Sequence, residues 1–331
     1  MIPLAEALRW LEARTDRLPP ETVELHEAAG RILAAELDPL DAPAFAALDG
    51  QAVRAAETEG ASDYVPLPVG GAPVVAGMPM PDGTDAVLPL HLLGAGPVAL
   101  GPVPPGHGVA HGDGLALATG TLLRPPHLAV LARRGLAAIS VVRRPRVALA
   151  VAGPKSGADA LTPMLTALVQ AGGGTLVSRG PDLCIHAGRS GPGPDDDGAA
   201  RLETVFAHGI LIRPGETSAL GTAGGVPALL LPGDPLACAA AFALLAAPAL
   251  RRMGGRPEPR PVSAALTRKI ASGLGQLDAV RVRLEDGRAT PLGPADSTML
   301  SAGAGADGLV LVPEGSEGYP AGATVWVHPL P

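Results

Sequence analysis

A continuous apolar run, Val147–Ala152, ends at a glycine and constrains the fold of this chain more than any other feature. A run without polar alternation is typical of a strand that is buried on both faces of a parallel sheet. Helical periodicity follows over Leu161–Ala171, and strand-like segments follow at Thr175–Ser178 and Leu183–His186. This alternation of strand and helix predicts a doubly wound, mostly parallel α/β domain with bounds at 144–255.

The second half of this predicted domain holds the longest apolar segment of the chain, Leu236–Leu250. The segment contains Pro248 and is shorter than a membrane-spanning helix, so it predicts a buried core helix. Asp234 is expected to cap this helix, and Pro235 is expected to occupy its first position. The other elements predicted here are a helix at Ala199–Ala207 and strands near Ile210 and at Ala228–Leu231.

Two regions with different residue patterns precede the α/β domain. From residue 38 to residue 119, Pro and Gly recur every few residues and the apolar runs shorten, which predicts an inserted β-rich domain. The segments on either side, 1–37 and 120–143, are expected to form a small helical domain. Its predicted elements are helices at 3–14, Leu25–Leu37 and Pro126–Arg134 and a strand at Ile139–Val142.

The last block, 256–331, consists of short strand-like segments and is predicted to form a small β-barrel or sandwich, of which we expect the barrel. The predicted strands are Val262–Leu266, Ala279–Leu284, Gly308–Val312 and Thr324–His328. The fold class expected for the whole chain is therefore multidomain α/β, with an inserted β-rich domain, a small helical segment and a C-terminal barrel.

Composition limits the classes of function. Apolar residues make up 47% of the chain and charged residues 17%, so a folded core is expected despite 44 Gly and 37 Pro. The net charge of −7 and the lack of a long Lys/Arg run argue against binding to nucleic acid or to a membrane. The N-terminal residues show no signal-peptide pattern, which predicts a cytoplasmic protein. For Cys184 and Cys238, buried inert thiols are favoured over a reactive thiol.

Glycine-rich loops follow the predicted parallel strands, at the edge where doubly wound domains bind ligands. These loops are Gly153–Gly157, Gly188–Gly193 and Leu231–Pro235. Glycines let backbone N–H groups approach an anion, and Lys155 and Arg189 could neutralise its charge. The alternative interpretation is that Gly and Pro simply end strands throughout this chain.

Two charged turns are further candidates for a site. Asp195 and the two aspartates after it could hold Mg²⁺ against phosphates, although a solvated acidic turn is the simpler interpretation. Arg213 and Glu216 place a permanent cation and a carboxylate at one turn, where an isolated ion pair is the alternative.

Several segments, taken in order, resemble the molybdopterin molybdotransferase family, which includes the MoeA-type proteins and the gephyrin E domain. The segments that carry the resemblance are Glu27–Ala34, Ala42–Arg54, Met78–Val87, Arg213–Gly215, Leu231–Pro235 and the strand-rich terminal block. The resemblance covers nearly the whole chain, and the first three segments together are its most specific part.

The resemblance implies a homodimer of four-domain subunits that cleaves adenylylated molybdopterin and inserts molybdate into it, with a divalent cation such as Mg²⁺. It implies that Asp49 and Asp113 are catalytic carboxylates and that Asp49 is also a metal ligand. Asp195, from the acidic turn, is a second candidate metal ligand that the residues themselves suggest. A molybdoenzyme or an adenylyltransferase is the expected protein partner. The residues expected to bind the pterin ligand are Lys155, Gly188, Arg189, Ser190, Arg213, Pro232, Pro235 and Ser301.

The chain departs from the family pattern at positions where charge matters. Lys155 stands in the loop where the family has a functional glutamate, and Arg213 and Glu216 replace the two lysines of a Lys-Pro-Gly-Lys turn. A helix-containing stretch before Asp182 is also expected to be missing. Three interpretations therefore stay open: a divergent transferase, a non-catalytic carrier, chaperone or regulator that binds molybdopterin, and a structural dimer that has lost the ligand.

Overall fold

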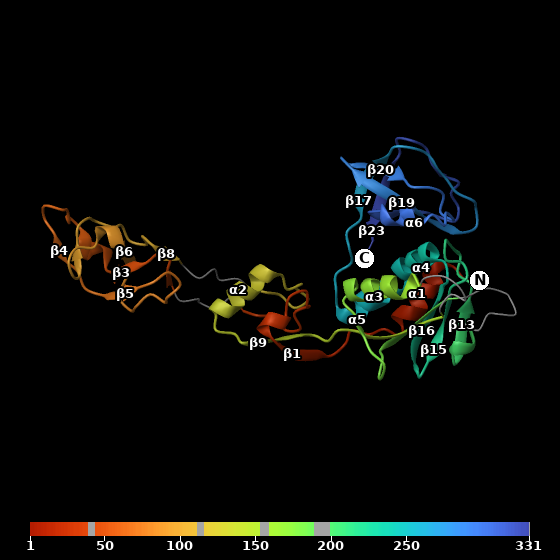
Figure 1. Ribbon diagram of the computed structural model, residues 1–331, viewed down its shortest axis with the longest axis horizontal. Helices are drawn as coiled ribbons and strands as arrows, with labels where there is room; N and C mark the ends of the chain where they lie inside the picture. Colours follow the sequence, from red (N-terminus) through yellow and green to blue (C-terminus); the bar gives the residue numbers. More distant parts are fainter. Residues whose placement is uncertain (39–43, 111–115, 153–158, 189–198, 331) are drawn as a thin grey trace. The chain divides into compact units, whose positions relative to one another are not determined.

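The computed structural model describes residues 1–38, 44–110, 116–152, 159–188 and 199–330. The chain divides into two compact units, which are shown coloured by sequence in Figure 1. The smaller unit is Glu36–Thr119, and the larger unit combines Met1–Ala35 with Gly120–Pro331. The predicted division of the chain into four domains stays a prediction.

The smaller unit is built from short antiparallel strands joined by turns. Its central sheet has the order β5-β3-β6, and two further pairs are β2-β8 and β4-β7. Val53, Leu88 and Ala99 belong to its apolar core. The strands are β2 (Phe45–Ala46), β3 (Gly50–Val53), β4 (Leu67–Pro68), β5 (Ala72–Val74), β6 (Ala86–Pro89), β7 (Val98–Ala99) and β8 (Val109–Ala110), with 3-10 turns at Ala55–Thr58 and Leu90–Leu92.

The larger unit contains a six-stranded sheet of order β11-β10-β12-β16-β15-β13. The first three pairings are parallel, whereas β15 and β13 are antiparallel to their neighbours. The reversal follows from the two-residue Gly224-Gly225 turn between β15 and β16, because a turn this short can join only antiparallel strands. The strands are β10 (Arg146–Val151), β11 (Thr175–Leu176), β12 (Leu183–Gly188), β13 (Thr204–His208), β15 (Ala219–Ala223) and β16 (Val226–Pro232).

Helices cover one face of this sheet and form its main core (Figure 1). They are α1 (Leu4–Glu12), α3 (Leu161–Ala171) and a long helix made of α4 (Pro235–Ala241), the π-helical segment η5 (Phe242–Ala246) and α5 (Ala247–Gly254). Phe242, which is fully buried, lies in this core beside residues of β12 and β16. The other face of the sheet is covered in part by Leu202, which follows a 3-10 turn at Ala199–Arg201.

The long helix confirms the prediction of a buried apolar helix but corrects its length. Because the π-helical segment continues the helix, it runs 20 residues, Pro235–Gly254, which by length and mean hydropathy would suffice to cross a bilayer. However, 67% of its most apolar window is buried inside the protein, as expected for a core helix. The predicted cap is confirmed, since Asp234 Oδ1 accepts hydrogen bonds from the backbone N of Leu236 (3.1 Å) and of Ala237 (2.9 Å).

Two predicted helices are wrong, and one strand is less buried than expected. Leu25–Leu37 forms only a 3-10 turn at Leu25–Glu27, because Gly30 takes a positive φ of 74° and the chain then turns into bridges with distant segments. Ala199–Ala207 ends in strand β13, whose Thr204-Val205-Phe206 sequence favours an extended backbone. In β10, Val147 is buried but the residues after it are only half-buried.

The remaining elements of this part are β1 (Pro20–Glu24), which pairs with β9 (Ala138–Val142), and α2 (Pro125–Arg133).

A closed barrel follows the α/β part, as predicted. Strands β19, β20, β17, β23 and β21 pair in that order, and β21 pairs back with β19. The short strand β14 (Ile212–Arg213), which precedes β15 in the chain, adds to β19 in parallel. The barrel elements are β17 (Val262–Leu266), β18 (Ile270–Ala271), β19 (Leu277–Glu285), β20 (Arg288–Pro291), β21 (Gly308–Val312), β22 (Gly318–Tyr319), β23 (Thr324–Pro329) and helix α6 (Leu300–Ala304).

Asp182, which directly precedes β12, forms hydrogen bonds with residues at and just before the start of β10. Its two carboxylate oxygens accept a bidentate pair of hydrogen bonds from Arg143 (2.8 and 2.9 Å), and one of them also accepts the backbone N–H of Arg146 (2.8 Å). Burial acts to raise the pKa of Asp182, but these hydrogen bonds and the two arginine charges outweigh it, so that the pKa is lowered.

This lowered pKa predicts a loss of stability in acid. The stabilisation from Asp182 is fully present above the pKa of the unfolded carboxyl group and is lost as the pH falls through the lower folded-state pKa, which places the loss below about pH 5. We expect the melting temperature of Asp182→Asn to fall less steeply on acidification than that of the wild type. Equal slopes, measured by calorimetry at matched ionic strength, would contradict this expectation.

Candidate functional site

The carboxyl ends of three parallel strands lie level with one another at one edge of the sheet. Val151 of β10 is opposite Ala187 of β12, and Gly188 of β12 is opposite Pro232 of β16. The backbone N–H of Ala152 donates to the Ala187 carbonyl (2.8 Å). The three loops predicted from sequence therefore begin at the same edge, which is where open α/β sheets bind ligands.

Gly188 is required by the geometry of this edge. Its φ is 143°, and a Cβ built on it would lie 2.6 Å from the Cβ of Ala152. Any side chain at this position would therefore strain the backbone and push β10 and β12 apart. Four residues predicted for the loops that follow, Lys155, Arg189, Ser190 and Asp195, lie outside the described residues.

The turn after β16 is closed by its own residues. Pro232 is buried at the end of the strand, Pro235 supplies no N–H, and the next two N–H groups of α4 donate to Asp234. The helix terminus thus offers few free donors, so an anion at this edge needs a cation from another element.

Arg281 provides such a cation, and sequence reasoning missed it. It lies on β19, is 6% exposed, and donates through Nη2 to the carbonyls of Ala295 (3.2 Å) and Ser297 (2.8 Å). Its Nη1 is buried and has no hydrogen-bond partner within the part of the chain that the structure describes. Burial lowers the pKa of Arg281, while the charges of Asp234 and Asp296 oppose this shift. A buried guanidinium with an unused donor is chemically suited to hold an anion through a charge-assisted hydrogen bond.

Arg213, which the sequence suggested as an oxyanion-binding residue, forms an ion pair with a buried carboxylate. Its Nε donates to Oδ1 of Asp278 (2.8 Å) and its Nη2 donates to Oδ2 (2.5 Å). Asp278 is 1% exposed and also accepts a hydrogen bond from the Ser272 hydroxyl (2.8 Å). The hydrogen bonds with Asp278 raise the pKa of Arg213. Its charge is therefore compensated inside the protein.

The predicted residue Ser301 lies on α6 and is exposed. Helix α6 packs against α4, since a Cβ on Gly303 would lie 2.2 Å from Cδ2 of Leu236. The barrel thus brings β19, the loop with Ser297 and α6 to the same end of α4. The sequence of β19 shows no clear sign of this arrangement, because Asp278 and Arg281 are followed on the same strand by the charged residues Arg283 and Glu285.

Asp49 lies on the smaller unit, just before β3. It is exposed, and its Oδ1 accepts the backbone N–H of Ala76 (2.8 Å). Gly50 is needed beside it, because a Cβ there would lie 2.1 Å from the Leu88 carbonyl oxygen. Asp113, its predicted catalytic partner, lies outside the described residues. Among the residues that can be described, no three His, Cys, Asp or Glu side chains gather as metal ligands.

The two cysteines are buried and free. Burial raises the pKa of Cys184, and it raises the pKa of Cys238 to about 12. Both thiols therefore stay protonated at neutral pH, which favours the interpretation as inert core residues.

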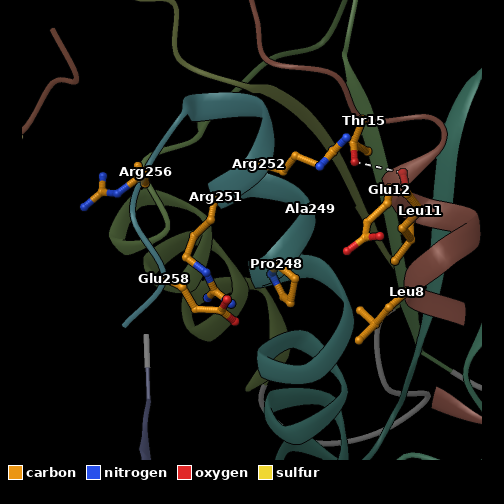
Figure 2. Close-up of a pocket in the computed structure, with 10 residues that line it drawn as sticks. All are labelled: Leu8, Leu11, Glu12, Thr15, Pro248, Ala249, Arg251, Arg252, Arg256 and Glu258. Carbon is orange, nitrogen blue, oxygen red and sulfur yellow. Dashed lines mark hydrogen bonds between the residues drawn. The ribbon is translucent and has the colours of Figure 1, made fainter. Parts of the chain in front are cut away.

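A cavity of about 360 Å³ lies between α1 and α5, as Figure 2 shows. Leu8, Leu11 and Pro248 form its apolar wall, and Arg251 and Arg252 lie at its rim. These arginines are in the last turn of the long helix, about 25 Å along its axis from Asp234. The cavity contains no residue that the sequence predicted for the site.

Comparison with known proteins agrees with this architecture. The family model for the MoeA N-terminal region (domain I and II) matches residues 2–135, and the model for the MoeA C-terminal region (domain IV) matches residues 263–330. The chain belongs to the MoeA family.

Similar proteins span nearly the whole chain. A protein of Mycobacterium tuberculosis named molybdopterin molybdenumtransferase 2 is 29% identical, with 94% of this chain and 95% of that protein covered. The molybdopterin molybdenumtransferase of Staphylococcus aureus is 26% identical, with coverage of 98% and 94%. The crystal structure of the molybdopterin biosynthesis MoeA protein of Pyrococcus horikoshii OT3 is 26% identical and superposes with a TM-score of 0.70, covering 99% and 100%.

This MoeA-family chain is shorter than its relatives in places. The alignment with the mycobacterial protein spans 386 positions but covers only 94% of a 331-residue chain, so that protein has segments with no counterpart here. Residues 177–182 alone join β11 to β12, and no helix is found in this connection. The expected loss of a helix-containing stretch before Asp182 agrees with this short connection.

The charge reversal at Glu216 has a simple structural setting in this family member. Glu216 is exposed, and its Oε2 accepts the backbone N–H of Gly215 (3.0 Å). The carboxylate therefore holds its own turn and is solvated, so that it does not need a ligand or a cation as partner.

Proposed function

We propose that this protein is a molybdopterin molybdotransferase, which cleaves adenylylated molybdopterin, releases AMP and inserts molybdate. The names of its relatives and the coverage of both chains support this assignment. The single structural observation that carries it is the unused Nη1 donor of buried Arg281, which lies near Asp234 at the carboxyl edge of the sheet.

Arg281 suits the oxyanions of this reaction. Molybdate and the phosphate of the pterin are both anionic and offer several acceptor oxygens, and a guanidinium binds such groups through charge-assisted hydrogen bonds. Because two carbonyls already hold Nη2, the side chain is fixed before the ligand arrives, so little conformational entropy is lost on binding.

Asp49 is proposed as the carboxylate that the smaller unit contributes. Its Oδ1 accepts the Ala76 N–H, and the residue is exposed. Asp49 is proposed as a ligand of a magnesium ion, which would neutralise negative charge on the substrates. We also propose that the protein is a cytoplasmic homodimer, with a molybdoenzyme or an adenylyltransferase as its partner.

Asp49→Asn is expected to lower kcat for AMP release about 10²- to 10⁴-fold while leaving the fold intact, in the range of a lost catalytic carboxylate. The amide oxygen can still accept the Ala76 N–H, so the variant removes charge and keeps the local hydrogen bond. Asp85→Asn is the matched control, because Asp85 also accepts one backbone N–H (Ala55, 2.7 Å) on the same unit. Equal kcat values for the two variants would remove Asp49 from the site.

The decisive measurement is AMP release from adenylylated molybdopterin by the purified protein, with Mg²⁺ and molybdate present. Release that depends on molybdate would establish the transferase. A folded protein that binds the pterin without releasing AMP would be a carrier, and a folded protein that binds nothing would be a structural subunit.

A further inference from the structure

We propose that Arg213 is a positioning residue that acts through Asp278 to hold Arg281 in place, and that it is not itself a ligand of the oxyanion. The role in catalysis rests on the proposed transferase function, whereas the structural part can be tested without it.

The first argument is the way in which β14 joins the barrel. Ile212 and Arg213 pair with Leu277 and Asp278 at the start of β19, and the Leu277 N–H donates to the Leu211 carbonyl (3.0 Å). Arg213 and Asp278 are thus direct neighbours in the ladder as well as an ion pair. This contact fixes the start of β19 against the α/β part of the same unit.

The second argument is the position of Arg281 on that strand. It follows Asp278 by three residues, so the two side chains point to opposite faces of β19. Asp278 faces inward with the barrel core residues Val280 and Val282, and Arg281 faces the same way as Ala279, which packs in the α/β core. Because a slip of one residue would exchange the two faces, the Arg213–Asp278 pair holds Arg281 toward the sheet edge.

The third argument is electrostatic. Asp278 is 1% exposed and its partners in the described structure are Arg213 and Ser272. Removing Arg213 would leave a buried carboxylate without its cation, and the strand would have to move toward water to relieve it. A residue that served only to bind ligand would not need a bidentate contact with a buried carboxylate.

A double-mutant cycle tests the catalytic role. Arg213→Gln is expected to raise the KM for adenylylated molybdopterin at least about fivefold in the wild-type background, and less than about twofold in the Arg281→Met background, because coupled residues are not additive. Arg268→Gln is the control, since Arg268 donates to the Pro291 carbonyl elsewhere in the barrel. Equal effects of Arg213→Gln in both backgrounds would show that Arg213 acts independently of Arg281 and would overturn the proposal.

The structural part is tested by labelling a cysteine in place of the arginine. In Arg281→Cys, the thiol should react slowly with a soluble maleimide, and adding Arg213→Gln should speed its labelling at least about tenfold, followed by mass spectrometry of the peptide. Addition of Arg213→Lys, which keeps the charge, should give a rate between the two. An unchanged rate in the Arg213→Gln protein would overturn the proposal.

These two tests distinguish failure of the proposed transferase function from failure of the proposed positioning role of Arg213. If the wild-type protein releases no AMP, the proposed function fails, and the labelling rate still decides whether Arg213 positions β19. If labelling accelerates but the KM effects are additive, Arg213 holds the strand but affects KM independently of Arg281, which contradicts the catalytic part of the proposal.

Discussion

Arg281→Met is expected to lower kcat/KM for AMP release roughly 10²- to 10³-fold, the range found when one preorganised oxyanion donor is removed. Methionine fills much of the same space without a charge, so the barrel should stay folded. The substitution removes the two hydrogen bonds to Ala295 and Ser297 together with the free Nη1. The measurement is steady-state AMP release at saturating molybdate, with the melting temperature recorded for each variant.

Arg283→Met provides the matched control for this prediction. Arg283 lies two residues further along β19, is exposed, and donates to one carbonyl, that of Gly305 (3.3 Å). We expect its kcat/KM to stay within about twofold of the wild type, as for a surface side chain. If both variants lost activity equally, the unpaired guanidinium would not be the feature that binds substrate.

Gly188→Ala is expected to destabilise the larger unit by roughly 2–6 kcal/mol, from backbone strain and overpacking together. The new Cβ would lie 2.6 Å from that of Ala152 at a φ of 143°. Unfolding of this unit can be followed by tryptophan fluorescence, because Trp10 is 8% exposed and stacks on Phe206 of β13, with ring centroids 5.2 Å apart. Urea titration gives the change in midpoint.

Gly224→Ala separates the effect of crowding from that of a positive φ alone. Gly224 has a φ of 60°, and a Cβ built on it meets nothing within 4 Å. We therefore expect a loss of only about 1 kcal/mol at this turn. A Gly188→Ala protein as stable as Gly224→Ala would show that β10 and β12 can separate at their carboxyl ends without cost.

Elements with a strong local signal were predictable from the sequence. The bounds of Leu161–Ala171, Val262–Leu266 and Gly308–Val312 agree with the structure to the residue, because each is an apolar segment bounded by polar, Gly or Pro residues. A helix was expected at Leu25–Leu37 because its alanines and leucines fit a helical period. The prediction is wrong because the positive φ at Gly30 and bridges with distant segments determine the backbone conformation there.

Residues of the candidate site could be predicted only where a local sequence pattern marks a single residue. Gly188 and Asp234 could be predicted because strand ends and helix caps have local patterns. Arg281 and the Arg213–Asp278 pair could not, because their roles depend on the pairing of β14 with β19 across 65 residues of sequence. An arginine in a strand does not by itself indicate a buried charge, since Arg281 is buried and Arg283 of the same strand is exposed.

The addition of β14 to the barrel has a consequence for cutting the chain into parts. A fragment that starts at residue 260 would contain all five strands of the closed barrel but would lack β14 and the guanidinium that neutralises Asp278. A fragment with the bounds of the matching C-terminal family region, 263–330, would therefore keep Asp278 buried without its cation, and we expect it to be less stable than the barrel in the whole chain. A barrel transferred from this chain to another protein would need to include the turn at Arg213.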